Sequence, residues 1–157
     1  MMFVPEILKY LRSRGITSLY GSPNQVNMAM QEVKFANSTN KTIAFVYLID
    51  EMQQVDGYEQ ANIGVYFARL CPFDFDGEDL LAAQDDMKDY GYALLYHLDS
   101  GNEITYDSTY VRWQFGYSDF AENVAWACLR ATLYARAQDC IPMGAGLDII
   151  NIDSAGK

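Results

Sequence analysis

Residues 62–79, with the sequence NIGVYFARLCPFDFDGED, contain the change from a strand pattern to a helix pattern that decides the fold. The first nine residues are largely apolar, with aromatic and β-branched side chains, and this composition is typical of a buried strand. Pro72 has no N–H to donate to a sheet, so we expect strand pairing to weaken there. Residues 76–77 supply turn chemistry, and the acidic Glu78 and Asp79 favour the positive N-terminal end of a following helix.

Two helices are predicted. Residues 78–98 are the stronger one, because apolar side chains recur at helical spacing and acidic side chains mark a solvated face. Its apolar positions are Leu81, Met87, Leu94, Leu95 and Leu98. Residues 3–14 show the same period over a shorter length, and Gly15 follows as a stop signal.

The clearest strand is residues 42–49, a continuously apolar run that indicates cover on both faces. We expect it to form a long-armed antiparallel pair with a strand at 62–71, joined by a polar connection at 50–60. The period of residues 25–35 fits neither a helix nor a strand. Further strands are expected at 16–20, 103–105, 110–115 and 147–152.

Residues 123–137 carry two conflicting signals. Their alanines and leucines favour a helix by propensity. With a period of two, however, one face would hold only alanine and leucine, and this alternation is cleaner than the helical one. We therefore expect a strand. The chain as a whole predicts a single α+β domain over 1–157, mainly an antiparallel sheet with the N-terminal helix and the long helix packed on one face.

The totals restrict the class of protein. The 157 residues are half hydrophobic, which predicts a folded domain, and the formal charge is −10. This excess of acidic residues argues against binding to the phosphate backbone of nucleic acids. The need for a soluble protein that does not self-associate nonspecifically explains the net charge. We find no signal peptide and no apolar run long enough for a membrane span, so we expect no membrane partner and synthesis in a reducing cytoplasm.

No catalytic, metal or cofactor site is predicted, and we expect a protein that is not an enzyme. The three cysteines form no CxxC pair, and the nucleotide-binding glycine motifs are absent. The acidic residues 74–79 do not match an EF-hand loop, because Gly77 falls at the wrong position. His97 is the only histidine, and packing or a favourable contact with a helix end explains it better than catalysis.

Aromatic residues are abundant, with 12 tyrosines and an aromatic share of 14%. Rings of this kind are enriched at protein interfaces. The alternative is that most tyrosines line a half-buried sheet and that both tryptophans belong to the core. We predict an oligomer or partner interface that includes Tyr58, Phe73, Phe75, Tyr110, Trp113, Phe115, Tyr117, Phe120 and Trp126.

An N-terminal helix, apolar strands, residues 72–77 leading into a long helix, and aromatic-rich strands together resemble small virion proteins of tailed phages. These are neck and tail-completion or tail-terminator proteins, including those of phages and prophages of gut bacteria. The likeness covers most of residues 3–140, and residues 72–77, PFDFDG, are its only motif. The resemblance implies a non-enzymatic subunit that assembles into a ring at the head–tail junction or the tail end, by heterologous contacts.

The resemblance also implies the partners, which are further copies of the chain and other tail or neck proteins of the virion. Residues 50–60 and the Phe73/Phe75 turn would reach neighbouring subunits, while acidic residues face a lumen through which DNA passes without specific binding. The chain departs from DNA-gripping neck proteins in its few basic residues. The alternative is a monomeric module that binds a host or partner protein through an aromatic-rich face.

Overall fold

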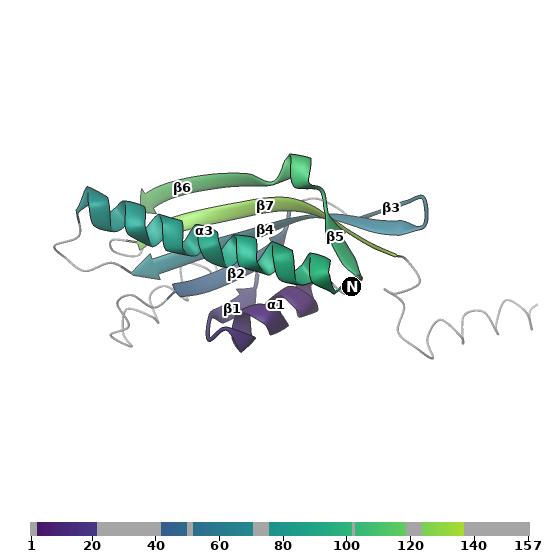
Figure 1. Cartoon of the computed structure of the whole chain (residues 1–157), viewed down its shortest axis with the longest axis horizontal. Coiled ribbons are helices and arrows are strands. Elements are labelled where there is room, and N and C mark those ends of the chain that lie inside the picture. The colour runs from purple at the N-terminus through teal and green to yellow at the C-terminus, as the bar shows by residue number, and fades with distance from the viewer. Residues whose placement is uncertain are drawn as a thin grey trace, which may run out of the picture.

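The structure, a computed structural model, shows two α-helices on one face of a seven-stranded sheet (Figure 1). It describes residues 3–21, 42–49, 52–70, 76–101, 103–118 and 124–136. The predicted α+β class, with a mainly antiparallel sheet and its helices on one face, is confirmed. Among these residues, no helix combines the length and the apolarity needed to cross a membrane.

The elements follow one another as helix, strands, long helix and strands. In chain order they are α1 (Phe3–Ser13), β1 (Thr17–Tyr20), β2 (Thr42–Leu48), β3 (Gln53–Val55), β4 (Tyr58–Leu70), α3 (Gly77–Ser100), β5 (Ile104–Tyr106), the 3-10 helix η1 (Ser108–Tyr110), β6 (Arg112–Ser118) and β7 (Val124–Arg136). Both predicted helices lie where they were expected. The strand expected at 147–152 lies outside the described residues, as do residues 25–35.

β4 and β7 form the centre of the sheet. They are antiparallel over their full length, from Tyr58 opposite Arg136 to Leu70 opposite Val124. β2 and β3 pair with the edge of β4 that faces away from β7. β5 and β6 pair with the edge of β7 that faces away from β4. β1 pairs with β2 and makes the one parallel pair among the described strands. The outer edges of the described sheet are therefore β1 and β3 on one side and β5 and β6 on the other.

The polar connection predicted at 50–60 is wrong in its second half, which is a hairpin between β3 and β4. Asp56 and Gly57 have φ values of 51° and 82°, and they form a two-residue loop between the paired Val55 and Tyr58. Two positive φ values match the turn that suits the twist of antiparallel strands. The Asp-Gly dipeptide is thus the cause of the hairpin, and β4 begins earlier than expected.

The strand predicted at 123–137 is confirmed as β7. Its alanine and leucine face, from Ala125 to Ala135, is buried in the core on the side that α3 covers. Burial against that layer outweighs the helix propensity of the segment, because strand preference depends mainly on packing on the pleated surface. The small side chains also leave room for α3 to lie close to the sheet.

The long helix begins where its acidic residues predicted. The Asp79 N–H donates to Asp76 Oδ1 at 2.9 Å, and the Asp76 N–H donates to Asp79 Oδ2 at 3.3 Å. This reciprocal capping box satisfies two backbone N–H groups at the start of α3 that would otherwise have no partner. Carboxylates at this end also interact favourably with the helix dipole.

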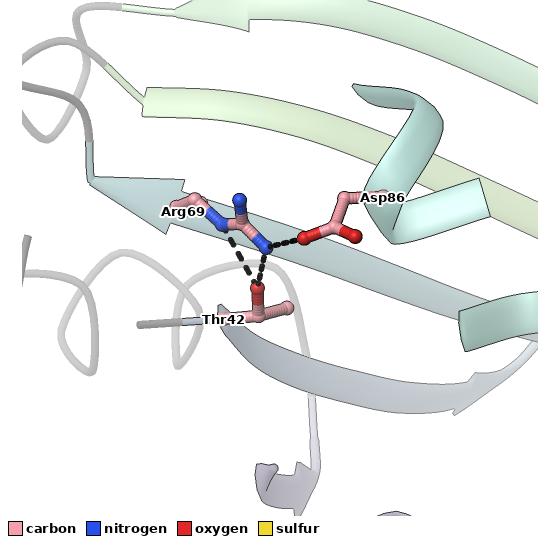
Figure 2. A network of polar contacts seen from close by, with 3 residues as sticks. All are labelled: Thr42, Arg69 and Asp86. Atoms are coloured by element: carbon pink, nitrogen blue, oxygen red, sulfur yellow. Dashed lines mark hydrogen bonds and ion pairs between the residues drawn. The ribbon is translucent and has the colours of Figure 1, made fainter. Parts of the chain in front are cut away.

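A polar contact ties α3 to two strands (Figure 2). Arg69 of β4 donates from Nη2 to Asp86 Oδ2 of α3 at 2.7 Å. It also donates from Nε and Nη2 to Thr42 Oγ1 of β2, at 3.0 and 2.8 Å. The Arg69 side chain is 13% exposed and that of Asp86 is 53% exposed, so water screens the ion pair from one side only. The contact helps to set the position of α3 over β4.

Candidate partner-binding surface

Three residues of the predicted interface lie in one row on β6. Trp113, Phe115 and Tyr117 alternate along the strand, so they share the sheet face on which α3 packs. The rings of Trp113 and Phe115 are nearly parallel, with centroids 5.8 Å apart and planes at 9°. Phe115 is 42% exposed and Tyr117 is 46% exposed, although both belong to a strand that packs on the core. We call these three residues the β6 aromatic row.

The row owes its place to small residues around it. Phe115 and Tyr117 pair across the sheet with Ala127 and Ala125, whose methyl groups cover little of the rings. Trp113 fits beneath α3 because Gly91 has no side chain, and a Cβ there would come within 2.3 Å of Trp113 Cη2. Its indole Nε1 is buried and has no hydrogen-bond partner within the described part of the chain.

α3 extends the row with residues that the sequence analysis missed. The Tyr92 ring lies 5.5 Å from that of Trp113 and is tilted by 56°, and Tyr92 is half exposed. Gln84 Nε2 donates to the Gly116 carbonyl at 3.0 Å and holds the helix against β6. The sequence did contain a signal for Tyr92, because it lies among the polar positions of the helix. An aromatic ring at such a position is not needed for the core and indicates a surface contact.

The row borders a free sheet edge. Within the described residues β6 pairs with β7 alone, so its outer edge has no strand beside it. At the opposite side of the sheet β1 pairs with β2 alone, and Leu19 and Tyr20 are exposed there. Unpaired edges can pair with another chain. The described molecule thus has two edges of different chemistry.

The other predicted interface residues that the structure describes do not join the row. Trp126 lies on the opposite face of the sheet, where its ring stacks on Tyr66 with centroids 5.4 Å apart. Tyr110 is exposed in η1. Tyr58 lines a half-open pocket of about 300 Å³ at the β5 end of the sheet, together with Glu103, Thr105, Tyr134 and Arg136. Phe73, Phe75 and Phe120 lie outside the described residues.

The sheet face opposite the helices carries a second group of polar and aromatic side chains. Tyr47 Oη lies 3.2 Å from Cys128 Sγ, and the Tyr47 ring occupies the space above Gly64. Burial and then the contact with Cys128 raise the pKa of Tyr47 to about 12, against a lowering by Arg130. Burial also raises the pKa of the neighbouring Tyr66 above its usual value.

The raised pKa of Tyr47 predicts a loss of stability at high pH. The unfolded chain loses the Tyr47 proton near pH 10, before the folded chain does, so unfolding becomes easier from pH 10 to about pH 12. We expect the urea midpoint to fall over this window in the wild type and to fall less in Tyr47→Phe. Equal slopes in the two proteins would contradict the assignment, and Tyr20→Phe, at an exposed position, is the matched control.

His97 contributes to the packing of the two helices. His97 lies in the last turn of α3 and stacks on Tyr10 of α1, with ring centroids 4.3 Å apart and planes at 14°. This contact joins the two helices. Across the described ranges, no group of three or more His, Cys, Asp or Glu residues is placed to hold a metal ion.

Comparisons with family models, with curated proteins and with solved structures give no match to this chain.

Proposed function

We propose that the chain is a structural subunit of a tailed-phage virion that assembles with copies of itself into a ring at the head–tail junction or the tail end. The observation that carries this proposal is the β6 aromatic row, whose Phe115 and Tyr117 rings are exposed on a strand that has no further strand beside it among the described residues. The phage setting comes from the resemblance of the sequence to neck and tail-completion proteins. Other tail or neck proteins of the virion are the further partners.

The two sheet edges support assembly by unlike surfaces. A ring needs heterologous contacts, in which one patch of a subunit meets a different patch of the next. The β6 edge is aromatic, whereas the β1 edge offers a short strand with exposed Leu19 and Tyr20. Rings at a sheet edge bury much apolar area on contact, and Trp, Tyr and Phe dominate such interfaces. The net charge of −10 makes repulsion, rather than adhesion, the expected effect on DNA in a lumen.

The row predicts the effect of removing its rings on assembly. In Phe115→Thr/Tyr117→Thr we expect the dissociation constant for self-assembly to rise by about 30-fold or more, because two interface anchors are lost. Threonine keeps the preference for a strand, so the fold should remain. Native mass spectrometry and light scattering after size exclusion measure the mass of each protein. Tyr110→Thr, which removes an exposed ring outside the row, is the control and should assemble like the wild type.

Two results would contradict this proposal. The first is a wild type that stays monomeric at high concentration, both alone and with tail proteins. The second is a double variant that assembles as well as Tyr110→Thr.

The alternative function is a monomeric module that binds a host or partner protein. The pocket between Tyr58 and Tyr134 favours it, because two aromatic rings and the charged Arg136 converge on one hollow. A pull-down from host lysate with the monomeric wild type separates the two functions. Capture of one host protein that Tyr58→Ala/Tyr134→Ala no longer binds would support the module, whereas co-purification with tail proteins would support the virion subunit.

A further inference from the structure

From the distribution of charge on the two sides of the molecule, we infer that the β6–β7 part of the sheet face opposite the helices is a docking surface for α3 of a second copy. This inference rests on the proposed assembly into a ring and specifies one of its contacts. Acidic residues on the outer side of α3 would meet arginines on the sheet of the neighbouring subunit.

The sheet face opposite the helices is cationic. Arg112 and Arg130 are exposed and lie directly opposite each other on β6 and β7. Arg136 is exposed on the same face of β7, six positions further along. None of the described strand residues on this face is acidic; Glu103, just before β5, lies beside Arg136 in the pocket. We call Arg112, Arg130 and Arg136 the arginine strip.

On this face, two glycines let large aromatic rings lie directly against the backbone of the sheet. The Tyr47 ring lies above Gly64, where a Cβ would come within 2.2 Å of Tyr47 Cζ. The Trp126 ring lies above Gly116 in the same way, 2.2 Å from a Cβ built there. One part of this face is already buried, at a cluster of Ile43, Phe45, Ala68 and Val124 against which Tyr66 and Trp126 pack. The exposed part is the stretch of β6 and β7 that carries the arginine strip. A helix can rest on such a surface, as α3 already does on the other face of the sheet (Figure 1).

The outer side of α3 has the complementary charge. Asp85, Asp89 and Asp99 are exposed there, and we call them the acidic ridge. Lys88 is the basic residue beside the ridge, with its Nζ 3.6 Å from Asp85 Oδ1. Tyr96 is 77% exposed on the same side of the helix and offers its ring to a guanidinium.

The spacing of the two sets agrees. Fourteen residues of α-helix separate Asp85 from Asp99, a distance of about 21 Å. Six residues of strand separate Arg130 from Arg136, a distance of about 20 Å. A helix laid along β7 can therefore bring one end of the acidic ridge to the Arg112/Arg130 pair and the other end to Arg136.

A second copy is a better occupant than a nucleic acid. The chain has a net charge of −10, and a long polyanion would extend beyond the arginine strip into this field. The acidic ridge supplies only a few charges over a matching length. The strip and the ridge also lie on opposite sides of one molecule, so they cannot meet within a single chain. The contact is therefore heterologous and repeats from copy to copy.

Charge reversal tests the contact. In Arg112→Glu/Arg130→Glu and in Asp85→Arg/Asp89→Arg, each protein alone should assemble at least tenfold more weakly than the wild type. An equimolar mixture should recover assembly, because the reversed strip of one protein meets the reversed ridge of the other. Light scattering after size exclusion and native mass spectrometry read the masses, and circular dichroism verifies the fold. Lys9→Glu/Arg14→Glu, with an equal change of charge on the α1 side, is the control for the first variant.

The outcomes separate this inference from the proposed function. Wild-type assembly that survives both reversals, or a mixture that does not recover, overturns the docking of α3 and leaves the ring proposal standing. A monomeric wild type overturns both. If a reversed variant fails to fold, the neutral Arg112→Gln/Arg130→Gln replaces it and should show the same weakening. Binding of a labelled single-stranded oligonucleotide that the arginine variants lose would assign the face to nucleic acid and overturn the inference.

Discussion

Replacing Gly91 by alanine is expected to lower the free energy of unfolding by about 2 kcal/mol, although alanine is the better helix former by about 1 kcal/mol. The new methyl group would lie 2.3 Å from Trp113 Cη2 and 3.3 Å from Leu129 Cδ2. The indole lies between α3 and the sheet and contacts the Tyr92 and Phe115 rings, so moving it aside disturbs these contacts. The same displacement should disturb the β6 aromatic row and weaken the self-assembly proposed above.

Urea unfolding monitored by circular dichroism measures the effect of Gly91→Ala. Gly77→Ala makes the same change at the start of the same helix, where nothing lies within 4 Å of the new Cβ, and should be neutral or slightly stabilising. A second change tests the cause: in the background of Trp113→Leu, the alanine should be nearly harmless, because the clashing ring has gone. Equal stability of Gly91→Ala and Gly77→Ala would refute this explanation.

Truncation of Leu129 should have a larger effect, a loss of about 3 kcal/mol in the free energy of unfolding for Leu129→Ala. Leu129 is 1% exposed on the central strand β7, opposite Trp113 and beneath Gly91. Its removal leaves a cavity at the point where β6, β7 and α3 meet. The packed strands and the helix on three sides limit how far the site can collapse.

The control for this change is another leucine. Leu81 of α3 is 60% exposed, so Leu81→Ala should alter stability by no more than about 0.5 kcal/mol. Thermal or urea unfolding of the two variants gives the difference directly. If both lose the same stability, burial on β7 is not what makes Leu129 important.

The parts of the fold that sequence predicted are those with local signals. The alternation of alanine and leucine in residues 124–136 identified β7, and the acids at 76–79 identified the start of α3. The 3-10 helix η1 was missed because it depends on one side chain: Asp107 Oδ1 accepts from the Thr109 N–H at 3.0 Å, between the strands expected at 103–105 and 110–115. The β3–β4 hairpin was missed because the polar composition of residues 50–60 indicated a loop, although the Asp-Gly dipeptide within it is a hairpin turn signal.

The surface was harder to predict than the fold. Trp113 and Trp126 both belong to aromatic-rich strands, yet they lie on opposite faces of the sheet. Their faces follow from the register between β6 and β7, which long-range packing sets. The arginine strip depends on the same register, since Arg112 and Arg130 meet only because Trp113 pairs with Leu129. Composition alone could not place these residues together.

The position of β7 in the chain has a consequence for the newly made protein. β7 is the last of the described elements, and it pairs with β4, β5 and β6 at the heart of the sheet. During synthesis on the ribosome, β4, β5 and β6 cannot complete the sheet until β7 has been made. Pairing between such distant parts of a chain is also slow. A nascent chain that lacks β7 therefore has no β6 edge to offer, so the proposed ring would form only from completed polypeptides.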